Sequence, residues 1–353
     1  MTAIYLTQPG SILQAKRQVF ELWHHQQLQR RVLAKMTSHI VLFHGCEITG
    51  EATALAFSHA LPVLFLDAEG RYLGRLHLDS DTPYLTQQLQ RAGDPEFMQN
   101  IAERIVSATL HNRRALLLSL NSCVCPTVEI ALEAIELFLD EIPAASLPQL
   151  RSHLATVNQI YYPALREWLW LNTLESAMPV DNLWHLGQAL LEQVGQGFLL
   201  EIGLDANLGG LHLSDGENLP LVRDLTLDWT VILVDRLALE FVLSHTNSTH
   251  NGNGNGNGNG NGNGNGNGNG NGNGHHQPLH QFIAAWEQQL ATLVTGNQTY
   301  RQCLRHQIRQ YQRSLCLDTP YRPALLKWTP KPVSTSATAP QPQGESLLPV
   351  PVL

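Results

Sequence analysis

The sequence predicts an α+β protein, with a small N-terminal β-rich domain over 1–85 and a larger, all-helical C-terminal domain over 86–328. Up to about residue 80, apolar runs are broken by Gly and Asp turn signals, which is typical of strands. From about residue 88, Leu, Ile and Ala recur three and four positions apart, which indicates amphipathic helices. The 353 residues are 43% hydrophobic, so the chain can bury a sizeable core in one large or two ordinary domains.

The strand signals of the first domain lie in two apolar runs. "HIVLFHGCEIT" (39–49) and "LPVLFLDAEGRYLGRLHL" (61–78) predict strands, and "GEATALAFSHA" between them has helical spacing. The stretch from Asp67 to Gly70 predicts a hairpin turn inside the second run. We therefore expect a strand, a short helix and a further strand pair.

The helical series begins at Asp94, an N-cap residue followed by Pro95 at the first helical position. A second amphipathic helix follows and is expected to be capped by Thr127. Apolar periodicity predicts five further helical segments, at 146–169, 182–204, 219–244, 278–294 and 300–317.

Two segments are not expected to fold. Residues 251–274 are twelve consecutive Asn-Gly pairs, a composition that favours turns and cannot form a core. We predict a flexible tether over 247–278 that interrupts the helical domain. Residues 329–353 are rich in Pro, Ser and Thr and predict a disordered tail.

The net charge and the length of the apolar runs indicate which partners and which cellular location the protein can have. The net charge of −8 argues mildly against nucleic acid as a partner, because phosphate binding needs a basic surface. The longest apolar runs are too short to span a bilayer, and the N-terminus has no signal-peptide pattern, so we expect a cytoplasmic protein with no membrane association. The five cysteines lack zinc-site spacing and are expected to be reduced, structural thiols.

Several blocks carry a family resemblance through their shared order and spacing. They are "LPVLFLDAEGRYLGRL", "DPEFMQNIAERIV" with "NRRALL", "GLDANLGGLH", "DLTLDWTVILVDRLAL", "AAWEQQL", "YRQCLRHQIRQY" and "PYRP". In this order they resemble the CRISPR-associated integrase-endonuclease family of spacer acquisition, from about Tyr5 to Trp328. "GLDANLGGLH" is similar to the family pattern G-L-D-P-x-x-G-x-L-H.

The resemblance implies a β domain that forms a homodimer and a helical domain that binds Mg²⁺ or Mn²⁺. In the family, a glutamate, a histidine and a second acidic residue hold the metal, which positions DNA phosphate for cutting or joining. The implied partners are DNA, a second copy of the chain and a small ferredoxin-like companion protein of the acquisition complex.

Only part of the implied ligand set is present. The family histidine corresponds to His212, and Asp224 lies where the second acidic motif begins. The glutamate position is occupied by Leu154, and the second acidic position by Leu227. Leucine cannot coordinate a divalent cation. Two basic family positions are also changed, to Thr109 and Thr230.

Three hypotheses remain. The first is a non-catalytic family member with a disabled metal site that at most binds DNA or a partner. The second is an active Mg²⁺- or Mn²⁺-dependent DNA endonuclease or integrase with a ligand set rebuilt from His153, His212, Asp224 and Asp228. His153 and Asp228 adjoin the leucines, but one residue along a helix is a rotation of about 100°. The third, an unrelated soluble enzyme, requires the block matches to be coincidental.

Overall fold

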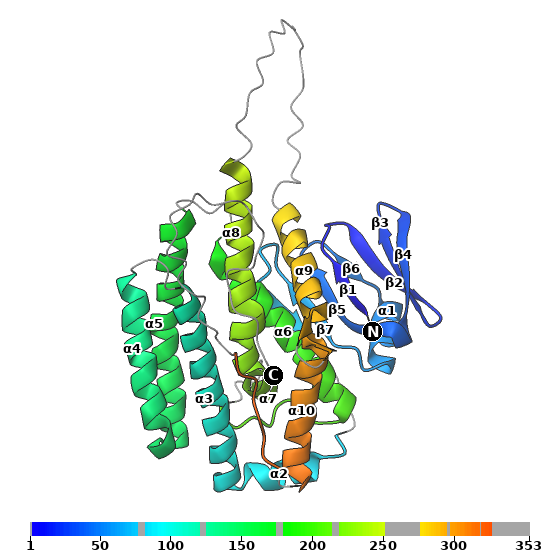
Figure 1. The fold of residues 1–353 in the computed structure, drawn as a ribbon. Coiled ribbons are helices and arrows are strands. Elements are labelled where there is room, and N and C mark those ends of the chain that lie inside the picture. The colour runs from blue at the N-terminus through cyan, green and yellow to red at the C-terminus, as the bar shows by residue number, and fades with distance from the viewer. Residues whose placement is uncertain are drawn as a thin grey trace, which may run out of the picture.

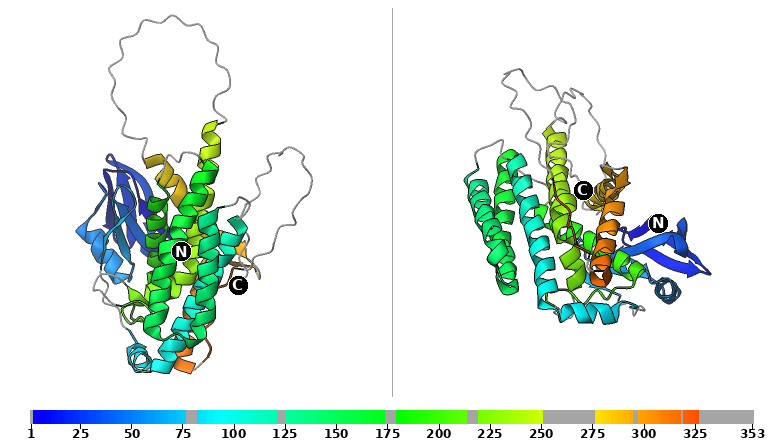
Figure 2. Two further views of the ribbon diagram at one scale, coloured as in Figure 1. Left: turned by 90° about the vertical axis from the view of Figure 1, so that its left-hand side faces the viewer. Right: turned by 60° about the horizontal axis from the view of Figure 1, so that its bottom comes forward.

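The computed structural model describes residues 2–76, 82–120, 125–173, 179–213, 219–250, 276–294, 297–317 and 319–326. It confirms the predicted α+β class: two small sheets come first in the chain and helices follow (Figure 1). Figure 2 shows the sheets on one side of the helical bundle and the helix pair over 126–173 on the opposite side. None of the described helices is both long and apolar enough to cross a membrane.

The first sheet has the strand order β1-β5-β7-β8. Its strands are β1 (Thr2–Leu6), β5 (Thr37–Phe43), β7 (Val63–Leu66) and β8 (Tyr72–Arg75). The first three pair in parallel, and β7 and β8 pair as an antiparallel hairpin. The predicted turn is confirmed: Asp67 accepts hydrogen bonds from the amides of Glu69 and Arg71, and Gly70 has φ 86°.

The second sheet has the order β4-β3-β2-β6. Its strands are β2 (Ser11–Lys16), β3 (Val19–His24), β4 (Gln27–Leu33) and β6 (Glu47–Ile48). A 3-10 turn, η1 (Ala34–Met36), leads from β4 into β5, and the predicted short helix is α1 (Gly50–Ser58). Thr49 caps α1 by accepting a hydrogen bond from the Ala52 amide.

The central strand β5 is apolar from Ile40 to Phe43, and both faces of this stretch are buried. Ile40 and Leu42 lie in a small core with the second sheet and α1. Val41 and Phe43 lie in the large core with the helices. Since successive side chains point to opposite faces of a strand, one run of sequence joins the two cores.

The helical region contains every helix that the sequence predicts, with some differences in the ends. The helices are α2 (Leu85–Ala92), α3 (Pro95–Leu120), α4 (Pro126–Glu141), α5 (Leu147–Thr173), α6 (Val180–Ile202), α7 (Pro220–Trp229), α8 (Arg236–His250), α9 (His276–Ala291) and α10 (Tyr300–Leu317). A 3-10 turn, η2 (Ile142–Ala144), follows α4. The Asp94 cap is confirmed, because its carboxylate accepts from the amides of Glu96 and Phe97.

Three expectations about this region need correction. Helix α4 begins at Pro126, with Cys125 before it, so Thr127 is not its cap; Pro126 supplies the fixed φ of a first helical residue. The region is not wholly helical, since β9 (Leu293–Val294) and β10 (Gln298–Thr299) form an antiparallel pair. Helices α8 and α9 extend into the tether range of 247–278. The remaining tether residues 251–275, and the tail expected at 329–353, lie outside the described residues.

The helix expected over 219–244 is divided by a π-helical turn, η3 (Thr230–Asp235). Two glycines let α6 pack closely against this stretch. A Cβ at Gly187 would lie 2.6 Å from Val234 Cγ1, and a Cβ at Gly195 would lie 2.9 Å from Thr226 Cγ2. The close approach of α6 to α7 and η3 therefore depends on the missing side chains.

We predict that Gly187→Ala lowers the free energy of unfolding by about 1–3 kcal/mol, because the added methyl overpacks the contact with Val234. Gly50→Ala is the matched control, since a Cβ there meets no atom within 4 Å. Urea unfolding followed by circular dichroism measures both variants. Equal stability of Gly187→Ala and the wild type would contradict the packing argument.

Candidate functional site

The loop over 203–213 leaves α6 at a glycine in the left-handed conformation. Gly203 has φ 73°, and its amide donates to the last carbonyls of α6. Only glycine adopts this conformation without a steric cost. Gln88 of α2 then holds Asp205, because its amide group donates to the Asp205 carbonyl and accepts from the Asp205 amide.

Two further glycines let the loop pass close to its neighbours. A Cβ at Gly209 would lie 2.6 Å from the carbonyl carbon of Pro220, and a Cβ at Gly210 would overlap the Met98 side chain. The loop therefore fits between Met98 of α3 and Pro220 of α7 only because residues 209 and 210 have no side chain. The glycines of "GLDANLGGLH" thus place His212 against α7.

Asp224 of α7 fixes this loop with one carboxylate. Its oxygens accept hydrogen bonds from the amides of Gly210 (2.6 Å), Leu211 (2.9 Å) and His212 (2.8 Å). The Nδ1 atom of His212 lies 2.7 Å from Asp224 Oδ1. The Asp224 side chain is 4% exposed and the His212 side chain 24% exposed, so the pair lies at the edge of the buried region. Nε2 is the ring nitrogen left to contact a ligand.

Arg151 of α5 binds the carbonyls of the same loop. Its guanidinium donates to the carbonyls of Leu211 (2.7 Å) and Gly210 (2.8 Å). Arg151 was not among the residues predicted from the sequence, although it lies one turn before Leu154 on the same face of the helix. Arg151 and Asp224 together bring α5 and α7 to the histidine loop.

The two leucines lie on the elements that carry these contacts. Leu154 follows Arg151 on α5 and is 6% exposed within the large core. Leu227 follows Asp224 by one turn on α7 and packs partly buried against the same core. Both leucines pack with the large core, one helical turn from a residue that binds the loop of His212.

The possible substitute ligands are engaged elsewhere. His153 Nε2 lies 3.2 Å from a carboxylate oxygen of Glu141, and its ring packs against Phe138 at an interplanar angle of 31°. Asp228 is fully buried and accepts hydrogen bonds from Gln307 Nε2 and from the Ala324 amide. Within the part of the chain that the structure describes, no three His, Cys, Asp or Glu side chains are grouped to hold a metal ion.

Asp228 fastens the segment 319–326, which we term the C-terminal strap. The Ala324 amide donates to Asp228 Oδ2 (2.6 Å), and the Leu326 amide donates to Asn112 Oδ1 (2.6 Å). Gln307 Nε2 also lies 2.7 Å from the Tyr321 hydroxyl oxygen. Burial raises the pKa of Asp228 to about 7, although the hydrogen bonds from Ala324 and Gln307 favour the carboxylate.

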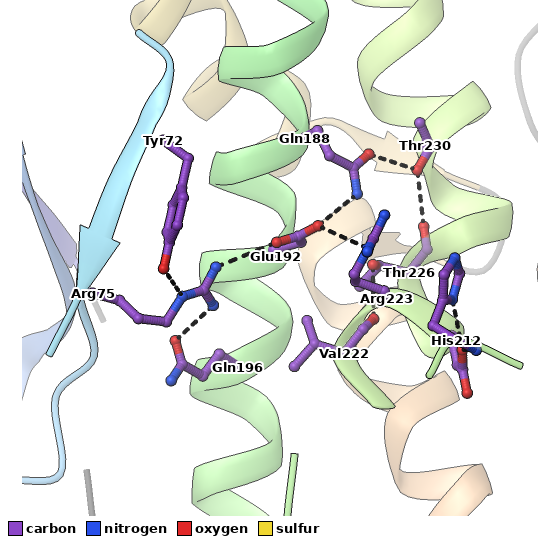
Figure 3. Close-up of polar contacts among 11 residues, drawn as sticks. Tyr72, Arg75, Gln188, Glu192, Gln196, His212, Val222, Arg223, Thr226 and Thr230 are labelled. Carbon is purple, nitrogen blue, oxygen red and sulfur yellow. Dashed lines mark hydrogen bonds and ion pairs between the residues drawn. The ribbon is translucent and has the colours of Figure 1, made fainter. Parts of the chain in front are cut away.

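A buried ionic contact joins the first sheet to the helices beside the site (Figure 3). Glu192 of α6 lies 3.3 Å from the Arg75 guanidinium of β8 and 3.7 Å from Arg223 of α7. Gln188 and Gln196 add hydrogen bonds to Glu192 and Arg75, and Thr230 donates to Gln188. The side chains of Arg75 and Glu192 are 8% and 10% exposed, so water hardly screens the pair.

A comparison with protein families matches residues 4–252 to the family described as CRISPR associated protein Cas1. Among curated proteins, the chain is 26% identical over 186 residues to a CRISPR-associated endonuclease Cas1 of Mycobacterium tuberculosis. That match covers 49% of this chain and 54% of the relative, so it spans about half the length of the curated protein.

Three solved structures share the fold. A Cas1 protein from Thermotoga maritima has a TM-score of 0.70 at 17% identity, covering 91% of this chain and 99% of that one. A chain of a Cas6-RT-Cas1–Cas2 complex has a TM-score of 0.71 at 17% identity, covering 91% of this chain and 36% of that one. A casposase bound to integration product has a TM-score of 0.69 at 14% identity, covering 92% and 93%.

We predict that Asp224→Ala lowers the free energy of unfolding by about 3 kcal/mol, because it leaves the buried Leu211 amide and the part-buried amides of Gly210 and His212 without an acceptor. Hydrogen exchange measured by mass spectrometry is expected to speed up at 210–212. Asp205→Ala is the control in the same loop, since its carboxylate accepts only exposed local bonds. An Asp224→Ala variant with wild-type exchange in this loop would refute the role of the carboxylate.

A second prediction concerns pH. The pKa of Asp228, about 7 when folded, exceeds its ordinary value of 3.8. The protonated form therefore favours folding, and its contribution is complete below about pH 4 and lost as the pH rises through 7. In the wild type, the urea concentration at the midpoint of unfolding should therefore fall between pH 4 and 7. We expect this fall to be smaller in Asp228→Asn, which has no carboxyl group to titrate at this position.

The exposed Asp140→Asn is the control and should leave the pH profile unchanged. Part of the slope should persist in Asp228→Asn, because burial also raises the pKa of Asp235 to about 7. A profile in Asp228→Asn as steep as in the wild type would show that Asp228 does not titrate in this range.

Proposed function

Because the chain belongs to the CRISPR-associated Cas1 family, we propose that it is a spacer-acquisition protein that has lost the metal-dependent nuclease chemistry of the family. It retains binding to DNA or to a protein partner. The observation that carries the proposal is the pair of leucines, Leu154 and Leu227, at the two positions where the family resemblance calls for carboxylates.

The surroundings of the leucines support this assignment of positions. Arg151 precedes Leu154 by one turn and binds the loop of His212, and Asp224 precedes Leu227 by one turn and binds the same loop. A hard divalent cation requires oxygen ligands, which hydrocarbon side chains cannot supply. The apolar packing of both leucines against the large core is what replaces the carboxylates.

The remaining donor set does not fit Mg²⁺ or Mn²⁺. His212 and Asp224 are hydrogen-bonded to each other, and both Asp224 oxygens also accept backbone amides. His153 is paired with Glu141, and Asp228 with Gln307 and Ala324. Moving these groups to a metal would break bonds that hold the loop and the C-terminal strap. No reaction step is therefore assigned to a metal in this chain.

The partners that we propose are DNA, a second copy of the chain, and a small ferredoxin-like protein of the acquisition complex. Solved structures with this fold include a Cas6-RT-Cas1–Cas2 complex and a casposase bound to integration product. The exposed edge strand β4 supports dimerisation through the β domain, because Leu28 and Leu33 on it are 36% and 45% exposed. Such a protein would act in the cytoplasm.

We expect no cleavage or integration when the purified chain is incubated with branched or duplex DNA and Mn²⁺, and the same result with His212→Ala. The reason is the missing pair of carboxylate ligands. Product formation is measured on denaturing gels with EDTA as the blank. Mn²⁺-dependent cleavage that disappears in His212→Ala would refute the proposal and favour the rebuilt ligand set.

Restoring the carboxylates tests the assigned positions. The double variant Leu154→Glu/Leu227→Glu is expected to bind Mn²⁺ by calorimetry, because it returns two oxygen ligands beside His212. Leu137→Glu is the matched control, since this leucine is 58% exposed on α4. A folded double variant with no more Mn²⁺ binding than the control would show that the leucines do not occupy the ligand positions.

A further inference from the structure

The C-terminal strap contains neither helix nor strand and runs back between α3 and α10 (Figure 1). Side chains pair with one of its two edges. Asn112 donates to the Ala324 carbonyl (3.0 Å) and accepts from the Leu326 amide (2.6 Å), as a residue of a neighbouring strand does. Asp228 accepts from the Ala324 amide (2.6 Å). On this edge, side chains therefore take the place of a neighbouring strand.

The other edge of the strap is unpaired. In an extended chain, the backbone groups of successive residues point to opposite edges. The amide and carbonyl of Ala324 face Asn112 and Asp228, so those of Leu325 point to the opposite edge. Neither group of Leu325 has a hydrogen-bond partner among the described residues, and this residue is 45% exposed. The edge can therefore pair with a further extended chain.

A cavity of about 890 Å³ lies beside this edge. Residues 322–325 line it together with parts of α3, η2 and α10, whereas Asn112 and Asp228 do not. The unpaired edge is therefore on the cavity side of the strap. Leu325 and Pro143 add exposed apolar side chains to the wall. The volume is near the top of the range of about 300–1,000 Å³ that ligand sites span.

The cavity carries an excess of positive charge, although the chain as a whole has a net charge of −8. Arg322 and His306 are exposed and have no hydrogen-bond or ion-pair partner among the described residues. Arg104 also lines the cavity, and its Nη1 donates to the Tyr321 carbonyl. Glu103 is the one carboxylate among the lining residues. The cavity therefore favours an acidic ligand.

Two observations favour a peptide over a nucleic acid as this ligand. Proteins bind single-stranded DNA largely by stacking its bases on accessible aromatic rings. Trp229 is the one Phe, Tyr or Trp among the lining residues, and it is fully buried. The unpaired backbone edge at Leu325 is the feature to which an extended peptide adds as a strand.

We propose that this cavity binds an extended, acidic segment of a protein partner, which pairs with the strap at Leu325 and places a carboxylate against Arg322. Main-chain hydrogen bonds supply affinity, and the pair of carboxylate and guanidinium supplies specificity. The site goes beyond the proposed function, because it needs no DNA and is not lined by Leu154, His212, Asp224 or Leu227.

The test measures binding of a fluorescein-labelled peptide, TVEVEVT, to the purified full chain by fluorescence anisotropy in buffer with EDTA. Two matched peptides are TVQVQVT, which lacks the charge, and TVEVEVT with alternate backbone nitrogens methylated, which keeps the charge but cannot pair as a strand. We expect TVEVEVT to bind about tenfold more tightly than TVQVQVT, the equivalent of one charge-assisted hydrogen bond. The methylated peptide should not bind.

Arg322→Ala is expected to remove the difference between TVEVEVT and TVQVQVT. Arg166→Ala is the matched control and should keep it, because Arg166 is an exposed arginine of α5 paired with Asp181. Thermal unfolding of both variants shows that the fold is retained. Because EDTA excludes any metal-dependent reaction, the result does not depend on whether the chain is a nuclease.

The proposal is overturned if TVEVEVT does not bind, or if TVQVQVT or the methylated peptide binds equally well. It is also overturned if Arg322→Ala behaves like Arg166→Ala. Displacement of TVEVEVT by single-stranded oligo(dT) at lower concentration than by the unlabelled peptide would likewise overturn it, since DNA would then be the better ligand of these cations.

Discussion

One carboxylate, that of Asp224, holds the site of this protein together. It is almost completely buried, and it accepts hydrogen bonds from three successive loop amides while its Oδ1 lies against the imidazole of His212. A buried carboxylate is costly unless its oxygens are satisfied, and a loop with several glycines is costly to order. The loop amides satisfy the buried carboxylate, and the carboxylate in turn orders the loop. The loop and α7 therefore stabilise each other in this arrangement.

Most of the fold could be predicted from periodicity. The continuous apolar run of β5 follows from burial on two faces, and the helices from apolar residues three and four apart. The start of α4 could not be predicted, because the sequence offers two start signals next to each other. Thr127 could have capped the helix, but Pro126 is its first residue. The π-helical turn at 230–235 lies against α6, and the apolar periodicity contains no sign of it.

The site was predictable where it is local in sequence. The turn glycines and His212 belong to one motif, and the resemblance named His212 and Asp224 as remaining ligand positions. The hydrogen bond between these two residues was not predicted. Arg151 could not be found in this way, because it binds backbone carbonyls, which any sequence provides. The partners of Asp228 could not be predicted either, because Gln307 and Ala324 are distant from it in the sequence and only the fold brings them together. The assignment of Leu154 and Leu227 as former ligand positions stays a prediction.

The ionic contact of Glu192 has a mechanical consequence. Arg75 belongs to the hairpin of the first sheet and Arg223 to the helix that carries Asp224, so a single side chain couples the two layers. Because Glu192 contacts both arginines, a shift of the hairpin would alter the distance from Glu192 to α7, the helix that carries the carboxylate partner of His212.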